Sequence, residues 1–210
     1  MRRCIILGAG GHARVVGAAA MALPDHEVVG FLDRTSENKG ERICGAPVLG
    51  AFDDLAALAR DGVSDVLLAL GDNSERKKLF EDAKIMGLRL PALCHVSAVI
   101  EPTARLGQGI YVGALAYVGV EASIGDGAII NTRASLDHES TLGAFTSLAP
   151  GVTVAGRSHI GNGAFLGISA SVADKVTIGE AVEIGAGAVV LSDIPAGSRA
   201  FGIPARIHTD

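Results

Sequence analysis

The chain has 210 residues, of which 49% are hydrophobic and 4% aromatic, and a formal net charge of −5. This length allows one large domain or two small ones. The negative charge argues against a general nucleic-acid binder, which needs a basic surface. No uninterrupted apolar run approaches the ~20 residues that a membrane span requires, so we expect no membrane association.

The three cysteines, Cys4, Cys44 and Cys94, are odd in number and widely spaced. They lack metal-ligand spacing and are typical of free thiols in a reducing compartment. The N-terminal apolar stretch is interrupted by His12 and Arg14, which argues against a secretory signal peptide. We therefore expect a cytoplasmic protein.

The first half of the chain shows the alternation of a βαβ unit. Continuous apolar runs, typical of strands buried on both faces, occur at residues 4–7, 28–32 and 66–70, and a last short strand is expected at residues 88–93. Helical spacing is found up to about Met21 and at residues 52–60 and 74–86, where Ser74 is the expected N-cap; residues 34–45 are polar and loop-like. Residues 1–95 are thus predicted to form a Rossmann-like α/β domain.

A glycine-rich turn follows the first predicted strand. Gly8-x-Gly10-x-x-Ala13, with Asp33 about twenty residues on, fits a phosphate-binding turn and a ribose contact. NAD binding is disfavoured because no second half-domain follows. A nucleotide or nucleotide-sugar site, at the carboxyl ends of the strands, remains the preferred interpretation, and a purely structural cap is the alternative.

A repeat of six residues organises the second half of the chain. An aliphatic residue falls at every sixth position without a slip, and a mostly small residue lies two positions before it, on the same face of a short strand. The sixteen aliphatic residues are Ile100, Leu106, Val112, Val118, Ile124, Ile130, Leu136, Leu142, Leu148, Val154, Ile160, Leu166, Val172, Ile178, Ile184 and Val190. This pattern predicts a parallel β-helix over residues 96–210, with roughly eighteen residues, three hexapeptides, per turn.

Two further features complete the predicted β-helix. The residue after each aliphatic is usually glycine, as a corner with positive φ would require. From about residue 195 the period breaks at Pro195 and Pro204, so this tail is expected to fold over the last coil or to reach a neighbouring subunit.

The repeat is most polar between residues 131 and 140. The corner residue is Asn131 and then Asp137 in consecutive repeats, and His138 and Glu139 follow directly. His138 should lie at a corner and point outward, where it can titrate. A general base is the preferred interpretation, and a bare surface histidine is the alternative.

These residues resemble a known family. Asn131-Thr132, Asp137-His138-Glu139, the turn Gly8 to His12 and the terminal Gly202-Ile203-Pro204-Ala205 are similar to bacterial nucleotide-sugar acetyltransferases of the left-handed β-helix superfamily. That group includes the bacillosamine- and perosamine-type N-acetyltransferases and the sialic acid O-acetyltransferases. The resemblance covers the whole chain and implies left-handed coiling and a homotrimer with active sites between adjacent solenoids.

The resemblance also implies an activity: direct transfer of an acetyl group from acetyl-CoA to the 4-amino group of a UDP- or GDP-linked 4-amino-4,6-dideoxy sugar. His138 would be the general base, Glu139 the carboxylate that raises its basicity, and Asn131 a nearby polar residue that orients base or substrate. The positions that match nucleotide-sugar contacts are Gly10, Gly11, His12, Asp33, Arg34 and Gly71, with Asn73 beside them. The positions that match acetyl-CoA contacts are Ser147, where a relative has histidine, and Ile168 and Ala186, eighteen residues apart.

Three rival functions remain open at this point. Sialic acid or other sugar O-acetylation is the nearest, and a non-catalytic nucleotide-sugar-binding scaffold is a second. A carbonic-anhydrase-type solenoid needs three zinc histidines, whereas the coil holds only His138 and His159 at different repeat phases. No metal is expected, since the transfer requires none.

Overall fold

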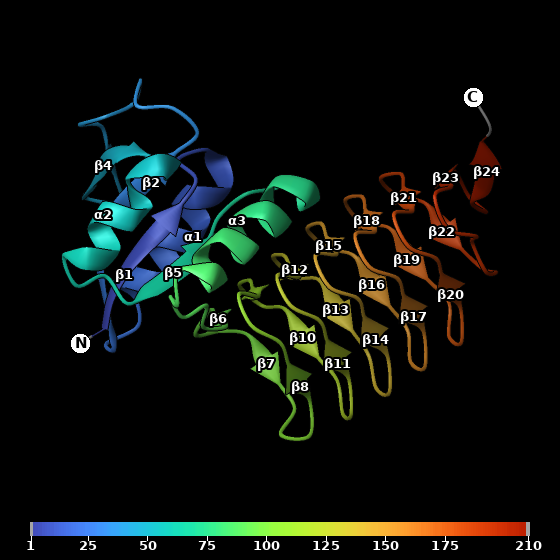
Figure 1. The fold of residues 1–210 in the computed structure, drawn as a ribbon. Helices are drawn as coiled ribbons and strands as arrows, with labels where there is room; N and C mark the ends of the chain where they lie inside the picture. The colour runs from blue at the N-terminus through green and yellow to red at the C-terminus, as the bar shows by residue number, and fades with distance from the viewer. Residues whose placement is uncertain (1, 209–210) are drawn as a thin grey trace. The chain divides into compact units, whose positions relative to one another are not determined.

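The computed structural model describes residues 2–208 and divides the chain into two compact units, Met1–Val96 and Ser97–Asp210. The boundary lies one residue from the one expected from the sequence. An N-terminal α/β unit with a parallel sheet and a C-terminal β-helix built from three parallel sheets confirm the predicted fold class (Figure 1).

The first unit is built on a five-stranded sheet in the order β3-β4-β2-β1-β5. Strands β1, β2, β4 and β5 run parallel, and β3 pairs antiparallel with β4. The strands are β1 (Arg2–Leu7), β2 (His26–Asp33), β3 (Arg42–Ile43), β4 (Ala46–Ala51) and β5 (Asp65–Leu68), and β6 (Leu93–Cys94) ends the unit. The helices are α1 (Gly11–Met21), α2 (Leu55–Arg60) after the 3₁₀ turn η1 (Phe52–Asp54), and α3 (Asn73–Ile85).

Three local expectations for this unit were wrong. Residues 42–51 form the β3–β4 hairpin, because Cys44 and Gly45 both adopt positive φ and reverse the chain where a loop was expected. The run 88–93 forms only a bridge from Arg89 to Asp65 before β6. The N-cap of α3 is Asp72, not Ser74, since the Asp72 carboxylate accepts the backbone N–H of Glu75 at 2.7 Å.

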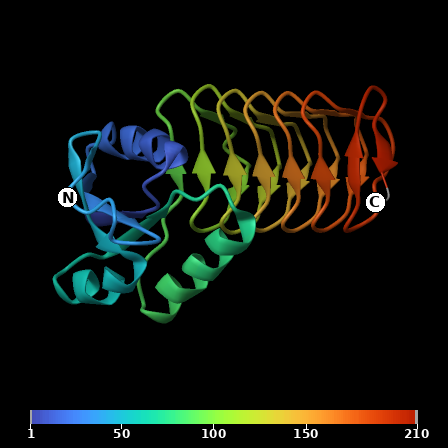
Figure 2. The same cartoon turned by 90° about the horizontal axis from the view of Figure 1, so that it is seen from above.

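From β7 to β22 the second unit is a stack of two-residue strands, in which each strand pairs with the one eighteen residues later (Figure 2). One sheet contains β7 (Val99–Ile100), β10 (Tyr117–Val118), β13 (Ser135–Leu136), β16 (Thr153–Val154), β19 (Ser171–Val172) and β22 (Val189–Val190). The second contains β8 (Arg105–Leu106), β11 (Ser123–Ile124), β14 (Thr141–Leu142), β17 (His159–Ile160) and β20 (Thr177–Ile178). The third contains β9 (Tyr111–Val112), β12 (Ile129–Ile130), β15 (Ser147–Leu148), β18 (Phe165–Leu166), β21 (Glu183–Ile184), β23 (Arg199–Phe201) and β24 (Arg206–His208).

The interior of the coil follows the six-residue pattern. The predicted aliphatic positions from Val112 to Val190 are all buried, which confirms them as the core. The inward polar residues Ser140, Thr146 and Ser158 are fully buried, and each hydroxyl donates to a carbonyl of the adjacent segment at 2.9–3.1 Å. Burial therefore leaves no hydroxyl of these three unsatisfied.

The reason given for the corner glycines was wrong. Positive φ occurs two positions later, where most residues are not glycine. Glycine is needed directly after the aliphatic because the next coil approaches closely: a Cβ on Gly125 would lie 2.5 Å from the backbone nitrogen of Ala144. Asn131 and Asp137 occupy this same corner position, and each side-chain oxygen accepts the N–H of the following residue at 2.7–2.8 Å.

The tail continues the sheet further than expected. Strand β23 pairs parallel with β21, and β24 then pairs back on β23 in antiparallel fashion. The rings of Phe201 and His208 stack with centroids 3.7 Å apart. The two strands therefore close the end of the coil despite the prolines.

Candidate active site

His138 lies at the corner between β13 and β14, with its side chain 45% exposed. Its Nδ1 lies 3.0 Å from the Glu139 carboxylate. Because an ionised carboxylate can only accept, Nδ1 carries the hydrogen, and in the neutral imidazole Nε2 is then the nitrogen with the free lone pair. His138 thus lies at an exposed corner, as its place in the repeat predicted, and Nε2 is the ring nitrogen that Glu139 does not engage.

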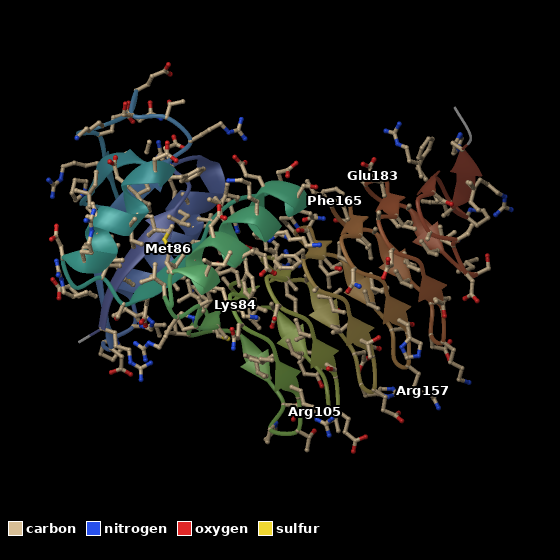
Figure 3. All side chains as sticks on the ribbon, in the orientation of Figure 1. Lys84, Met86, Arg105, Arg157, Phe165 and Glu183 are labelled. Carbon is tan, nitrogen blue, oxygen red and sulfur yellow. The ribbon has the colours of Figure 1, made fainter. Side chains whose placement is uncertain are left out.

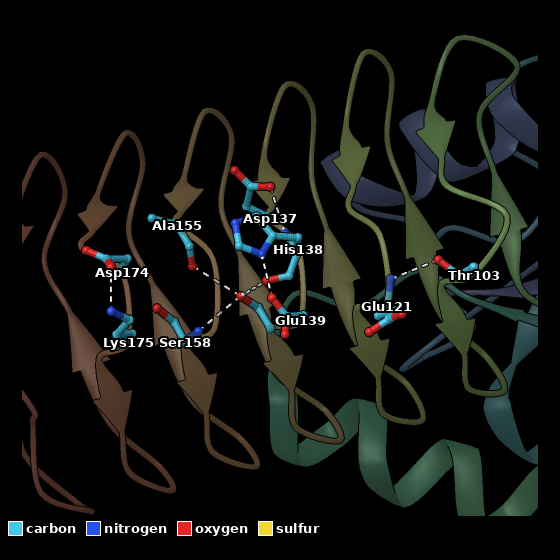
Figure 4. A network of polar contacts seen from close by, with 10 residues as sticks. Thr103, Glu121, Asp137, His138, Glu139, Ala155, Ser158, Asp174 and Lys175 are labelled. Atoms are coloured by element: carbon cyan, nitrogen blue, oxygen red, sulfur yellow. Dashed lines mark hydrogen bonds and ion pairs between the residues drawn. The ribbon is translucent and has the colours of Figure 1, made fainter.

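The backbone around His138 is held on both sides (Figure 4). Its N–H donates to the Asp137 carboxylate at 2.7 Å, and its carbonyl accepts the N–H of Arg157 at 2.8 Å. The buried Ser140 hydroxyl bonds to the carbonyl of Ala155 and accepts the N–H of Ser158, each at 3.1 Å. These bonds tie the histidine corner to the next coil, so the imidazole stands on a rigid frame.

A cavity of about 290 Å³ lies on the third sheet of the coil, at its corner with the first. Its floor is apolar and its rim carries the Glu183–Arg199 ion pair, with Nε and Oε2 3.2 Å apart. Figure 3 shows two of its residues, Phe165 and Glu183, on the neighbouring strands β18 and β21. The lining residues are Phe165, Gly167, Ile168, Glu183, Ile184, Gly185, Ala186, Arg199 and Phe201.

Two of the three predicted acetyl-CoA positions, Ile168 and Ala186, line this cavity. They occupy the same corner on successive coils, as their spacing predicted. Ser147 lies on β15, one coil before Phe165, and is nearly buried; it is not among the lining residues.

His138 and this cavity occupy different edges of one coil. His138 follows a strand of the first sheet, whereas Ile168 and Ala186 follow strands of the third. Asn131 follows β12 of the third sheet, so it shares the edge of Ile168 and not that of His138. One chain therefore does not bring the predicted base, Asn131 and the cavity together.

The first unit gathers its predicted site residues at the carboxyl ends of β1, β2 and β5. The glycine turn after β1 leads into α1, whose N-cap is Gly10. A Cβ added to Gly10, Gly11 or Gly71 would meet nothing within 4 Å, so packing does not explain these glycines. The N–H groups at this helix start and the open space beside Gly10 and Gly11 suit a phosphate-bearing ligand.

Asp33 and Arg34 follow β2, and each is fixed by neighbours. The Asp33 carboxylate accepts the N–H of Arg34 at 2.8 Å and the amide of Asn38 at 2.9 Å. The Arg34 guanidinium makes a bidentate pair with Glu75 of α3, at 2.9 and 2.7 Å, and this hydrogen-bonded carboxylate raises the pKa of Arg34. The pair joins the carboxyl end of β2 to α3, the helix that follows β5.

A buried arginine that the sequence analysis did not single out organises the loop at the carboxyl end of β5. Arg76 of α3 is fully buried, and its Nη1 donates to the carbonyls of Leu70 and Gly71 at 3.0 and 3.3 Å. Its Nη2 donates to the Asn73 side-chain oxygen at 2.7 Å. Burial lowers the pKa of Arg76 to about 10, so it stays charged at neutral pH. Arg76 thus shapes the loop that carries Gly71 and Asn73.

His12 lies in the first turn of α1, where the charge of Arg76 affects its pKa. Burial, and then the positive charge of Arg76, lower the pKa of His12 to about 4. The imidazole is therefore neutral at pH 7, and it can take part in this site through hydrogen bonds and not through charge.

Two sequence families match the chain in the same order as its two units. Residues 3–83 match the PglD N-terminal domain, and residues 157–192 match the bacterial transferase hexapeptide (six repeats). The UDP-N-acetylbacillosamine N-acetyltransferase of Bacillus subtilis is 34% identical over 115 residues, which are 53% of this chain and 51% of that enzyme. The chain thus spans about half the length of this curated relative.

Solved structures extend the likeness to both units. PerB from Caulobacter crescentus, solved with CoA and GDP-perosamine, is 39% identical with a TM-score of 0.94, covering 100% of this chain and 98% of that one. The acetyltransferase domain of PglB from Neisseria gonorrhoeae, solved with acetyl coenzyme A, is 35% identical with a TM-score of 0.92, covering 99% of each chain.

The chain belongs to the PglD-type nucleotide-sugar N-acetyltransferases of the hexapeptide left-handed β-helix superfamily. Membership confirms the family suggested by the sequence resemblance. Within residues 2–208, none of the helices is long and apolar enough to cross a bilayer. The same residues contain no group of three or more His, Cys, Asp or Glu side chains placed to hold a metal ion.

Sequence reasoning missed Glu75 and Arg76 of this candidate site. Both lie in a helical stretch whose charges are typical of a solvated face, and nothing in the spacing distinguishes them from Lys77 or Lys78. Only the packing of α3 on β5 shows that Arg76 points inward.

The depressed pKa of His12 predicts a pH-dependent stability. Between about pH 6.5 and pH 4 the unfolded chain binds a proton at His12 that the folded chain does not, so stability falls as pH falls through this window. We expect a loss of roughly 3 kcal/mol by pH 4 from this residue. Urea denaturation at several pH values across this window gives the free energy of unfolding at each pH. This free energy should fall less steeply with falling pH in His12→Gln than in the wild type. The same pH dependence in both proteins would contradict the assignment.

Proposed function

We propose that this protein transfers the acetyl group of acetyl-CoA to the amino group of a nucleotide-linked 4-amino-4,6-dideoxy sugar. The observation that carries the proposal is the His138–Glu139 pair, in which the carboxylate engages Nδ1 and leaves Nε2 to act as the base, on the coil of a chain whose full length resembles PerB. PerB was solved with CoA and GDP-perosamine, a nucleotide-linked amino sugar.

The chemistry is a direct acyl transfer. The neutral sugar amine attacks the thioester carbonyl, the new C–N bond forms, and the C–S bond to CoA breaks. Nε2 of His138 takes the proton from the amine and passes it to the departing thiolate. Help of this kind contributes roughly 10²–10⁴-fold, and neither a metal nor an acyl-enzyme is needed. Glu139 holds Nδ1 and stabilises the imidazolium while it exists.

Variants of the Caulobacter enzyme support a catalytic histidine. Its histidine-to-alanine and histidine-to-asparagine variants, 38% identical to this chain over 98% of their length, were also solved with CoA and GDP-perosamine. Both ligands therefore bind in these variants without the imidazole, as expected where the histidine acts on a proton and not as a binding group.

The cavity at Ile168 and Ala186 is the proposed seat of acetyl-CoA. Its floor is apolar, and the two residues stack on successive coils, so a pantetheine arm can lie along the coil axis and pair with backbone groups. Ser147 and Asn131 share this side of the coil and are proposed to border the same groove.

A homotrimer would unite the separated parts. Because His138 and the cavity lie on different edges of one coil, a complete site needs the His138 edge of one chain beside the cavity edge of another. Three copies arranged around a threefold axis parallel to the axis of the β-helix would form three such grooves.

The first unit is proposed to hold the nucleotide sugar through Gly10, Gly11, His12, Asp33, Arg34, Gly71 and Asn73. The helix start supplies N–H groups for the diphosphate, and Asp33 supplies an acceptor for the ribose hydroxyls.

The free thiols Cys4, Cys44 and Cys94 fit a cytoplasmic location.

A substrate panel tests this function. Purified protein is incubated with acetyl-CoA and UDP- or GDP-linked 4-amino-4,6-dideoxy sugars, their 4-hydroxy counterparts, and free sialic acid. Thiol release gives the rate, and NMR of the product locates the acetyl group. We expect N-acetylation of one amino sugar and no turnover of its hydroxy counterpart. An acetyl group on oxygen would overturn N-transfer, and binding of both ligands without turnover would favour a scaffold.

A further inference from the structure

The position two residues after each buried aliphatic, here termed the second corner position, carries a side chain almost everywhere along the coil. From Pro102 to Ala186 it recurs fifteen times, and fourteen of these residues are Pro, Gln, Ala, Val, Asp, Thr, His, Asn, Ile or Glu. The single exception is Gly156, one turn after His138. The coil itself therefore has no general need for glycine at this position.

The backbone gives no reason for a glycine at residue 156 either. Gly156 is absent from the glycines with positive φ, so an alanine could adopt its conformation without strain. The glycines at the preceding corner position, such as Gly125, face the backbone of the next coil instead. The explanation for Gly156 must lie in what its missing side chain leaves free.

What Gly156 leaves free is the space of the His138 ring. A Cβ on Gly156 would lie 2.5 Å from Cε1 and 2.9 Å from Cδ2 of His138, and closer still to Nε2, whereas ordinary contacts begin at 3.4 Å. The conflict centres on Nε2, the nitrogen left to accept a proton once Glu139 has engaged Nδ1.

We propose that Gly156 is a positioning residue, which lets the His138 imidazole lie against the next coil with Nε2 unobstructed while Nδ1 stays bonded to Glu139. The role rests on the proposed function only for its kinetic consequence. The backbone of His138 cannot shift to make room, because its carbonyl accepts the N–H of Arg157. A side chain at residue 156 would therefore make the ring rotate about its side-chain bonds and break the contact between Nδ1 and Glu139.

Gly156→Ala is expected to lower kcat about 10²-fold, the size of effect that a displacement of about 1 Å produces at a reacting group. The KM values for acetyl-CoA and for the amino sugar should stay within about twofold, because neither ligand seat contains the ring. In a His138→Ala background the same change should cost less than about twofold, since no ring is left to displace. Equal losses in both backgrounds would overturn the proposal.

Ala144→Ser serves as the matched control. It adds one heavy atom at the second corner position of a neighbouring repeat, away from His138, and should leave kcat and the melting temperature unchanged. Gly156→Ala should melt close to the wild type as well, because residue 156 lies at a corner and not in the core.

A readout that does not depend on turnover separates this inference from the proposed function. In ¹⁵N-labelled protein, long-range NMR correlations should report the Nδ1–H form of His138 in the wild type and a mixture of the two neutral forms in Gly156→Ala. A wild-type ring pattern retained in Gly156→Ala would refute the positioning role. A changed pattern in a protein that acetylates none of the sugars would sink the function and leave the positioning role standing.

Discussion

His138→Ala should lower kcat for acetyl transfer about 10²–10⁴-fold, with KM values for both substrates close to those of the wild type. The expected split follows from the geometry: the imidazole is exposed at a corner and belongs neither to the cavity nor to the proposed nucleotide-sugar site. Steady-state kinetics with the amino sugar identified in the panel measure both parameters. The residual rate would come from holding the two substrates together.

His138→Asn and Glu139→Gln separate the parts of this effect. Asparagine keeps a polar side chain but offers no base, so it should be as slow as alanine. A glutamine in place of Glu139 can still accept the hydrogen of Nδ1 but cannot stabilise an imidazolium by charge, so Glu139→Gln is expected to cost about tenfold. A His138→Ala enzyme that retains near wild-type kcat would eliminate His138 as the base.

Arg76→Met should destabilise the first unit by about 3 kcal/mol and raise the KM for the nucleotide sugar about tenfold. Methionine fills similar space but leaves the carbonyl of Leu70 without its donor and releases the Asn73 side chain. The loop with Gly71 and Asn73 then loses its fixed shape. The cavity proposed to hold acetyl-CoA belongs to the second unit, so the KM for acetyl-CoA should not change. Urea denaturation and two-substrate kinetics test the two halves of this prediction.

Lys77→Met is the matched control, because Lys77 is the exposed neighbour of Arg76 on the same helix and should change neither stability nor KM. Arg76→Lys should lie between wild type and Arg76→Met, since one ammonium cannot span the Leu70 carbonyl and the Asn73 amide as the planar guanidinium does. A large loss of stability with an unchanged nucleotide-sugar KM would show that Arg76 serves folding alone.

The β-helix was predictable almost residue by residue, because six-residue spacing fixes which side chains face inward. The reasons for individual residues were less accessible. Glycine after each aliphatic looked like a turn residue, yet it is there because adjacent coils approach to within a few ångströms. The resemblance implied that Asn131 is a neighbour of His138, but within one chain a whole face of the coil separates the two corners.

The sequence by itself determined the two units, the inward positions of the coil, the outward-facing His138 beside Glu139, and the glycine turn after the first strand. Each of these depends on local spacing, which a chain carries in one dimension. Only the tertiary structure decided that Arg76 is buried under the Leu70–Asn73 loop, that Glu75 holds Arg34, and that Gly156 lies against the ring of His138. These contacts join residues that sequence spacing does not relate, since side-chain packing and the stacking of one coil on the next create them.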